Sequence, residues 1–377
     1  MVALWLGLWW GVLGALFAPA VPGGAWTVAM VAVATTAPLA ALLLGFRRQL
    51  YPGALFRLLV MRPFWYAQLL LPVLGGAGVL GALGGLPFGA AGAAGRWTVG
   101  VVGAVAAAVL LAGYVGSRRM VLTHVTASWP DLPEGLDGLR IAQLSDVHVG
   151  PHTPRRHLAR AVRLVQDAAP DLVAVTGDLI DDHAPDVDHY ARSLGSLAAP
   201  LGVYAIPGNH DVYAGWPVVR AALARLPLTV LVNDAVVVER GGARLAVVGT
   251  GDPAGRGAGP EGAAPDIPAA LAGVPGDAFV VALAHNPALW PALADRGVPL
   301  TLSGHTHWGQ FALPRLGWSL ASPFLEHAMG TYARDGSLLY IHPGTNYWGI
   351  PFRLGTPPEV AIVTLRRGAL GIERVPV

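Results

Sequence analysis

The sequence contains no cysteine and no lysine, and it contains no acidic residue before Asp131. The absence of cysteine excludes disulfide bonds and thiolate metal sites. All 25 basic residues are therefore arginine, and only five of them lie in the first 115 residues. The chain thus divides into an N-terminal part with almost no charge and a remainder that carries every carboxylate.

The charge distribution also bears on the choice of partner. The net charge is +2, and the first 115 residues contribute +5, so the remainder carries −3 (2 − 5). Nucleic-acid binding by the polar part would require a basic patch there. We therefore predict no nucleic-acid partner, despite the high isoelectric point of the whole chain.

Long apolar stretches fill the N-terminal part. The hydrophobic share of the chain is 54%, above the roughly 45–50% of soluble proteins. Four stretches, at residues 2–20, 25–46, 65–86 and 97–116, each have about the 17–25 residues that a bilayer-spanning helix needs. Residues 1–116 are therefore predicted to form a four-helix transmembrane region.

Two alternatives apply to this region. The first stretch could be a signal peptide, because Ala18 and Ala20 suit a cleavage site, although a basic segment before it is absent. A channel or transporter is disfavoured, since such proteins place polar residues within their spans. Here the spans contain little beyond Thr35, Thr36 and Gln68.

The arginines predict the orientation. Four of them lie in the loop at residues 47–63, and Arg118 and Arg119 follow the last stretch, whereas Arg96 alone lies between the third and fourth stretches. Because positive loops stay in the cytoplasm, we predict a multi-pass cell-membrane protein whose polar part, after residue 117, faces the cytoplasm.

After a predicted linker at residues 117–138, short apolar runs end in Gly, Asp or His. Such runs are typical of buried strands, and they occupy residues 139–144, 171–176, 202–206, 244–248, 278–284 and 300–303. Residues 154–169 show helical spacing, so an α/β domain over residues 139–377, with its site at strand ends, is predicted. Residues 337–342 and 360–365 are predicted as an antiparallel addition, and residues 251–276 as a mobile surface loop.

Five short motifs follow these strands in order: Ser145-Asp146-Val147-His148, Gly177-Asp178, Gly208-Asn209-His210-Asp211, Ala284-His285-Asn286 and Gly304-His305-Thr306-His307. Each one alone is common. Together they supply the carboxylate and imidazole ligands that suit Mn, Fe, Co or Zn. A shared carboxylate can hold two such ions at the separation needed for in-line phosphoryl displacement.

With these motifs, residues 139–366 resemble the calcineurin-like metallophosphoesterases, specifically their membrane-associated bacterial branch. The resemblance implies a β-sandwich flanked by helices and two divalent metal ions, drawn from Mn, Fe, Zn or Co. It implies that Asp146, His148 and His307 bind the first ion, that Asp178 bridges, and that Asn209, His285 and His305 bind the second. It also implies that His210 protonates the leaving oxygen, that Asp211 orients His210, and that a metal-bridging hydroxide attacks phosphorus.

The predicted function is a membrane-anchored phosphoesterase that hydrolyses a phosphodiester or phosphomonoester, with a lipid-linked phosphoester as the leading substrate class. The alternative is a catalytically silent, membrane-tethered scaffold of the same fold. Trp308, where similar sequences usually have Gly, is predicted either to line the substrate groove or touch lipid, or to be a packing residue. Arg353 is a candidate phosphate clamp, with a surface ion pair as the alternative. His342 is a candidate functional residue near the predicted pocket, and Asp252 is a candidate either to support a ligand or to contact substrate.

Overall fold

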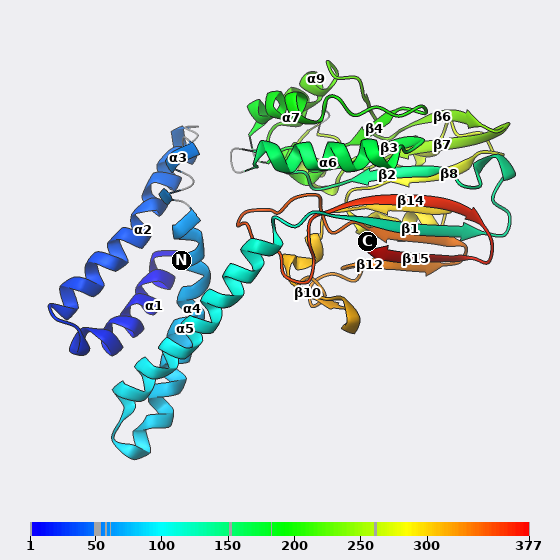
Figure 1. The fold of residues 1–377 in the computed structure, drawn as a ribbon. Coiled ribbons are helices and arrows are strands. Elements are labelled where there is room, and N and C mark those ends of the chain that lie inside the picture. The colour runs from blue at the N-terminus through cyan, green and yellow to red at the C-terminus, as the bar shows by residue number, and fades with distance from the viewer. Residues whose placement is uncertain are drawn as a thin grey trace. The chain divides into compact units, whose positions relative to one another are not determined.

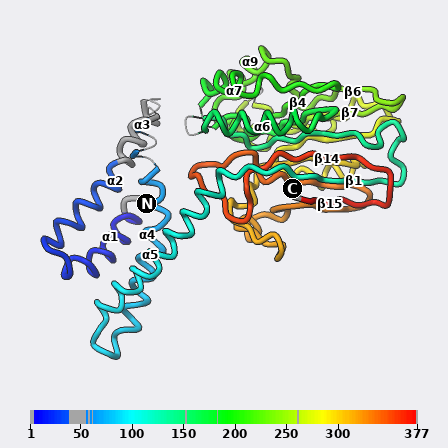
Figure 2. Tube along the Cα trace, viewed as in Figure 1, coloured from blue at the N-terminus to red at the C-terminus, as the bar shows by residue number. Residues whose placement is uncertain are grey.

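The structure, a computed structural model, describes residues 2–48, 54–56, 59–60, 62–150, 153–181, 183–259 and 262–376. The chain forms two compact units, Met1–Ala112 and Gly113–Val377. Figure 1 and Figure 2 show a helical first unit, blue to cyan, and a second unit built on β-sheets.

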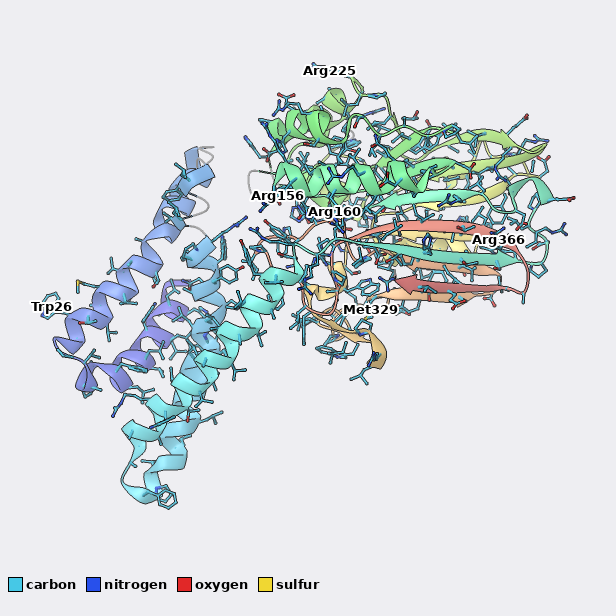
Figure 3. All side chains as sticks on the ribbon, viewed as in Figure 1. Trp26, Arg156, Arg160, Arg225, Met329 and Arg366 are labelled. Atoms are coloured by element: carbon cyan, nitrogen blue, oxygen red, sulfur yellow. The ribbon has the colours of Figure 1, made fainter. Side chains whose placement is uncertain are left out.

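The first unit consists of apolar helices at the four predicted positions. They are α1 (Val2–Phe17), α2 (Gly24–Arg48), α4 (Arg62–Gly85) and α5 (Ala91–Gly116), with the short α3 (Ala54–Phe56) and the 3₁₀ turns η1 (Ala18–Ala20) and η3 (Leu86–Phe88). The last turn of α5, from Gly113, belongs to the second unit. Many large apolar side chains point outward, among them Trp26, labelled in Figure 3, which is 79% exposed. An apolar exterior of this extent is typical of a surface that contacts lipid or another protein.

Two helices of the described chain are long and apolar enough to cross a membrane, Arg62–Phe88 and Ala91–Gly116. The apolar helices before them, Leu4–Ala20 and Gly24–Ala37, are shorter over the residues that were described. Part of the predicted loop at 47–63, including Arg57, lies outside the described residues.

The second unit contains two mixed sheets. The first sheet has the order β15-β1-β14-β2-β3-β4-β5 and the second β12-β13-β9-β8-β7-β6. The strands of the first are β1 (Val121–Trp129), β2 (Arg140–Leu144), β3 (Leu172–Thr176), β4 (Val203–Ile206), β5 (Thr229–Val230), β14 (Glu359–Arg367) and β15 (Gly371–Pro376). Those of the second are β6 (Asp234–Arg240), β7 (Ala243–Gly249), β8 (Phe279–Leu283), β9 (Leu300–Ser303), β12 (Gly330–Arg334) and β13 (Ser337–Ile341); β10 (Ala312–Leu313) and β11 (Trp318–Ser319) form a separate hairpin.

The sheets pack face to face, and helices cover their outer faces. Ile141 and Val363 of the first sheet share one buried cluster with Leu245 and Leu300 of the second. Figure 1 shows α6, α7 and α9 over the other face of the first sheet. The helices are α6 (Arg155–Ala168), α7 (Val187–Leu194), α8 (Asn209–Tyr213), α9 (Trp216–Leu223), α10 (Ile267–Leu271) and α11 (Trp290–Ala294). Because layers cover both faces, β3 is buried at all five positions.

The structure differs from the sequence predictions at three places. Residues 117–138, expected as a linker, contain β1, which pairs parallel to β14 and antiparallel to β15. The two late strands predicted as one antiparallel addition lie in different sheets: β13 is parallel to β9, and β14 is antiparallel to β2. Residues 251–276 contain α10 and the 3₁₀ turn η6 (Pro253–Gly257) rather than only a loop.

Candidate metal centre

The seven predicted ligands all follow strands that end at one edge of the sandwich. Asp146 and His148 follow β2, Asp178 follows β3, and Asn209 follows β4. The second sheet contributes His285 after β8, and His305 and His307 after β9. Within each sheet these strands run parallel, so their carboxyl ends meet at the same edge, where α/β folds place ligands.

Most of these residues have an unusual backbone conformation. Five of the seven lie in the left-handed region: Asp146, His148, Asp178, His305 and His307, with φ between 41° and 71°. Left-handed residues other than Gly are uncommon and cluster where a side chain must point in an otherwise unavailable direction.

Two motif glycines make room for the carboxylates. A Cβ atom on Gly208 would lie 2.2 Å from Oδ1 of Asp178, and one on Gly304 would lie 2.3 Å from Oδ2 of Asp146. Both distances are far below van der Waals contact. Any larger residue at these positions would displace a ligand.

The first donor cluster is formed by Asp146, His148 and His307. The two histidine Nε2 atoms are 3.0 Å apart, and His307 Nε2 is 3.4 Å from Oδ1 of Asp146. His148 Nε2 also lies 3.6 Å from Oδ2 of Asp178. Three side chains from both sheets thus direct donor atoms at one point.

The second cluster is centred on the same Asp178. Its Oδ2 is 3.2 Å from His285 Nε2, which is also 3.2 Å from Oδ1 of Asn209. That oxygen in turn lies 2.9 Å from Nδ1 of His305. Asp178 therefore belongs to both clusters, as a bridging ligand would.

The donor set fits two transition-metal ions. Atoms about 2.1 Å from one cation in tetrahedral or octahedral geometry lie about 3.0–3.4 Å from each other, and the distances within both clusters are close to that range. His285 Nδ1 donates to the carbonyl of Thr176 at 2.8 Å, which leaves Nε2 free as a ligand. The structure therefore brings all seven predicted residues together in an arrangement that could hold the metals.

Burial and neighbouring charges shift the pKa values of two of the ligands, Asp178 and His307. Burial alone would raise the pKa of Asp178, but the charges and hydrogen bond of His285 and the nearby His148 outweigh burial and hold that pKa well below its usual range. Burial lowers the pKa of His307, and the cation of Arg353 lowers it further. An ionised carboxylate and a neutral imidazole are the forms that bind metal.

Arg353 lies beneath the first cluster. Its guanidinium is 1% exposed and donates to the carbonyls of His307, Pro343 and Asn346 and to Nδ1 of His307. Burial lowers the pKa of Arg353 to about 9, so the side chain stays charged at neutral pH. The prediction that Arg353 clamps a phosphate is therefore wrong, because its guanidinium is buried and donates to acceptors inside the protein.

His210, the predicted proton donor, lies beside the centre. Its ring centroid is 4.8 Å from that of His148, and its backbone N–H donates to Oδ1 of Asp178 at 2.9 Å. The donor atoms of His148, Asp181 and His210 all lie within 4.8 Å of one another. Asp181 is a carboxylate that the sequence analysis missed, three residues after Asp178.

Asp211 has a different set of partners from the predicted one. Its carboxylate accepts hydrogen bonds from the backbone N–H groups of Leu179, Ile180 and Gly208. Burial, followed by repulsion from Asp178, raises the pKa of Asp211 to about 7, although the three N–H groups oppose this. These bonds fix the loop after Asp178 to the turn that carries His210.

Three further candidates prove to be interior residues. Trp308 is 2% exposed, packs with Trp290 and Ile341, and donates from Nε1 to the Ile341 carbonyl at 3.0 Å, so it neither lines a groove nor touches lipid. Asp252 caps η6 by accepting from the N–H of Ala254. His342 is fully buried and accepts from the N–H of Gly344.

Comparison with known proteins agrees with this geometry. Residues 139–309 match the family model described as calcineurin-like phosphoesterase. A metallophosphoesterase of Aquifex aeolicus is 30% identical over 262 residues, which cover 69% of this chain and 97% of that protein. The chain belongs to the calcineurin-like metallophosphoesterases.

Two vertebrate relatives have names that refer to a membrane. The Danio rerio "Transmembrane protein with metallophosphoesterase domain" is 36% identical over 247 residues, 63% of this chain and 55% of that protein; the Bos taurus protein of the same name is 34% identical. The chain spans about half the length of these two metallophosphoesterases. Among solved structures, one described as a novel archaeal phosphodiesterase aligns with 63% of this chain and 100% of its own, at 12% identity and a TM-score of 0.35.

Proposed function

We propose that this metallophosphoesterase is a membrane-anchored, two-metal hydrolase of a phosphodiester or phosphomonoester. The observation that carries the proposal is the pair of donor clusters that share Asp178 and have His210 at their side. Asp146, His148 and His307 would hold one ion, Asn209, His285 and His305 the other, and Asp178 both. When bound, such ions supply Lewis-acid activation of water and neutralise charge on the phosphoryl group.

The side chain that completes hydrolysis is His210. Water adds across the P–O bond, so the leaving oxygen must take up a proton as that bond breaks. His210 is fixed by its N–H bond to Asp178 and carries a ring at the edge of the first cluster. Its place beside Asp181 and at the edge of the first cluster supports its role as the group that donates a proton to the leaving oxygen.

The proposal includes the membrane. Two apolar helices and the names of the vertebrate relatives support an anchor. Four spans, with the catalytic unit on the cytoplasmic face, are supported by the arginines of the loop at 47–63 and by Arg118 and Arg119. A topology reporter fused to the C-terminus tests the orientation: an extracytoplasmic signal would contradict it. A lipid-linked phosphoester remains the proposed substrate class.

The test of the enzyme itself is His210→Ala in the full chain, assayed on an aryl phosphodiester with added Mn²⁺. We expect turnover to fall at least ~100-fold while metal content stays unchanged, because His210 is not a ligand. His124→Ala, which changes an exposed histidine on β1, is the matched control and should keep full activity. Equal activity in the two variants would remove the proposed role of His210, whereas a natural chain that binds metal but hydrolyses no phosphoester would favour a silent scaffold.

A further inference from the structure

One short segment of the catalytic unit has an apolar surface that the fold does not cover. Residues 311–325, which we call the apolar flap, contain the hairpin β10–β11 and a single charge, Arg315. Leu316 is 75% exposed and Phe324 80% exposed, and Leu313, Leu320 and Leu325 are exposed as well. The flap follows β10, labelled in Figure 1, and its gold segment extends away from the two sheets.

The flap begins at the metal centre. Its first residue comes four positions after His307. The side chain of Gln310 pairs with the backbone of Trp348 through two hydrogen bonds of 3.0 Å. Trp348 is 49% exposed, and its ring lies 5.7 Å from that of His210. Gln310 and Trp348 therefore connect the start of the flap to the proposed proton donor.

Residues 353 and 354 link the flap to the last turn of α5, which belongs to the second unit. The backbone N–H of Arg353 donates to the carbonyl of Gly113 at 2.9 Å. The next residue, Leu354, donates to the carbonyl of Gln310 at 3.0 Å and accepts from the N–H of Ala312 at 2.9 Å. Only two steps of backbone hydrogen bonding thus separate the flap from the end of a helix that is long and apolar enough to span a bilayer.

The surroundings of this helix end have the character of a membrane interface. Arg118 lies 4.5 Å from the ring of Tyr114, a pairing of aromatic and basic residues typical of the head-group level. Arg119 is also exposed, and Arg160, labelled in Figure 3, donates to the Met120 carbonyl. These cations complement anionic head groups.

We propose that the apolar flap inserts into the bilayer surface at the point where α5 leaves it, so that the metal centre faces lipid head groups. The occupant is a lipid bilayer, because the flap is apolar, carries Arg315 as its single charge, and lies next to the end of a candidate membrane span that Arg118 and Arg119 follow. The second part of the inference, that the hydrolysed phosphoester belongs to a membrane lipid, rests on the proposed function.

The insertion is tested without any assay of activity. Because the natural chain lacks cysteine, Phe324→Cys, Leu316→Cys and the control Leu370→Cys each give one attachment site for an environment-sensitive fluorophore. Leu370 is 44% exposed and lies in the turn after β14. Because β14 begins at the end of the sheet nearest the metal centre, this turn lies at the opposite end of the sheet. The labelled full-length proteins are placed in nanodiscs that contain anionic lipid, and metal content is measured for each to confirm folding.

We expect spin-labelled lipids to quench the probes at 316 and 324 at least twofold more than the probe at 370, and aqueous iodide to show the reverse order. Iodide quenching at 324 equal to that at 370 would overturn the proposal. Protection from both quenchers would also overturn it, because a second copy or another protein would then cover the flap.

The lipid-substrate part has its own test. The double variant Leu316→Ser/Phe324→Ser should lose at least tenfold activity on a phosphodiester lipid embedded in nanodiscs, while its hydrolysis of a soluble aryl phosphodiester stays within twofold of the natural chain. Equal loss on both substrates, or no loss on either, would overturn this part. If the natural chain hydrolysed neither substrate, the proposed function would fail, whereas the quenching result would stand independently.

Discussion

Arg353 donates from Nη2 to Nδ1 of His307 at 2.9 Å. A guanidinium has no acceptor atom, so Nδ1 must accept, and the single proton of the neutral ring lies on Nε2, which has to release it to bind a metal ion. The contact therefore fixes the ring of His307 with Nε2 directed at His148 and Asp146. Ligating histidines usually donate their second nitrogen to a carbonyl or carboxylate, and a cation in that place is a departure from this arrangement.

The first prediction concerns this contact. Arg353→Met should weaken metal binding by roughly 10–100-fold, the usual effect of removing a partner behind a ligand, since His307 loses its fixed orientation. Isothermal titration with Mn²⁺ measures the affinity. Arg353→Lys keeps a buried cation with fewer donors, and its affinity should lie between those of the natural chain and Arg353→Met. Unchanged affinity in Arg353→Met would show that His307 is positioned by its own backbone alone.

The two aspartates near His210 are predicted to behave differently. Asp181→Asn should lower kcat about 10–100-fold with little change in stability, because this carboxylate lies within 4.8 Å of the His148 and His210 donors. Asp211→Asn should instead lower the melting temperature, since the amide cannot accept all three backbone N–H groups that Asp211 now binds. Kinetics and thermal unfolding on both variants separate the two roles.

Trp308 is predicted to stabilise the fold despite its strained backbone. The left-handed backbone of Trp308, with a φ of 50°, costs less for glycine, so Trp308→Gly gains about 1–2 kcal/mol of unfolding free energy at this position. Removing a buried indole costs about 3–5 kcal/mol, and here the hydrogen bond to Ile341 and the Arg374 guanidinium 4.8 Å from the ring are lost as well. We expect a net loss of about 2–3 kcal/mol in thermal or denaturant unfolding, with Trp308→Phe closer to the natural chain. A stabilised glycine variant would contradict this.

His342 predicts a pH dependence of stability. Burial lowers the pKa of this histidine to about 4, below the ordinary 6.5. The unfolded chain therefore binds a proton at a pH where the folded chain does not, and stability falls as pH drops from about 6.5 to 4, by up to about 3 kcal/mol. His342→Asn keeps an acceptor for the Gly344 N–H and should show a shallower fall. Melting temperatures at pH 7 and pH 5 provide the comparison.

Metal removal should destabilise the catalytic unit. An ion that binds only the folded state adds about 3 kcal/mol to the free energy of unfolding when its concentration is a hundred times its Kd. Each kcal/mol shifts the melting temperature of a unit of this size by about 2–4 °C. We therefore expect EDTA to lower the melting temperature by about 6–12 °C and Mn²⁺ to restore it. Asp178→Asn, which lacks the shared carboxylate, should respond much less to EDTA.

The sequence was sufficient to locate the strands that carry the site. Six predicted strands coincide with β2, β3, β4, β7, β8 and β9 to within two residues at each end, because buried parallel strands are continuous apolar runs. The polar residues after five of these strands then meet at one edge, and the structure shows the predicted convergence.

Other features depended on tertiary contacts that local patterns do not contain. Asp181 and Asp211 are both aspartates near a motif, and only the folded backbone shows that one faces His148 while three N–H groups enclose the other. Arg353 looked like a surface cation because its four acceptors become neighbours only on folding. The strand β1 was missed because its partners lie more than 230 residues later in the chain.

That distant pairing has a consequence for how the protein is made. Residues 121–129 leave the ribosome soon after the last helix of the first unit, but both of their neighbours in the sheet, β14 and β15, are synthesised only from Glu359 onward. Non-local pairings of this kind form slowly. Until β14 and β15 emerge, β1 has two unpaired edges directly after the apolar helices, and a chain cut short before Glu359 would keep those edges open to aggregation.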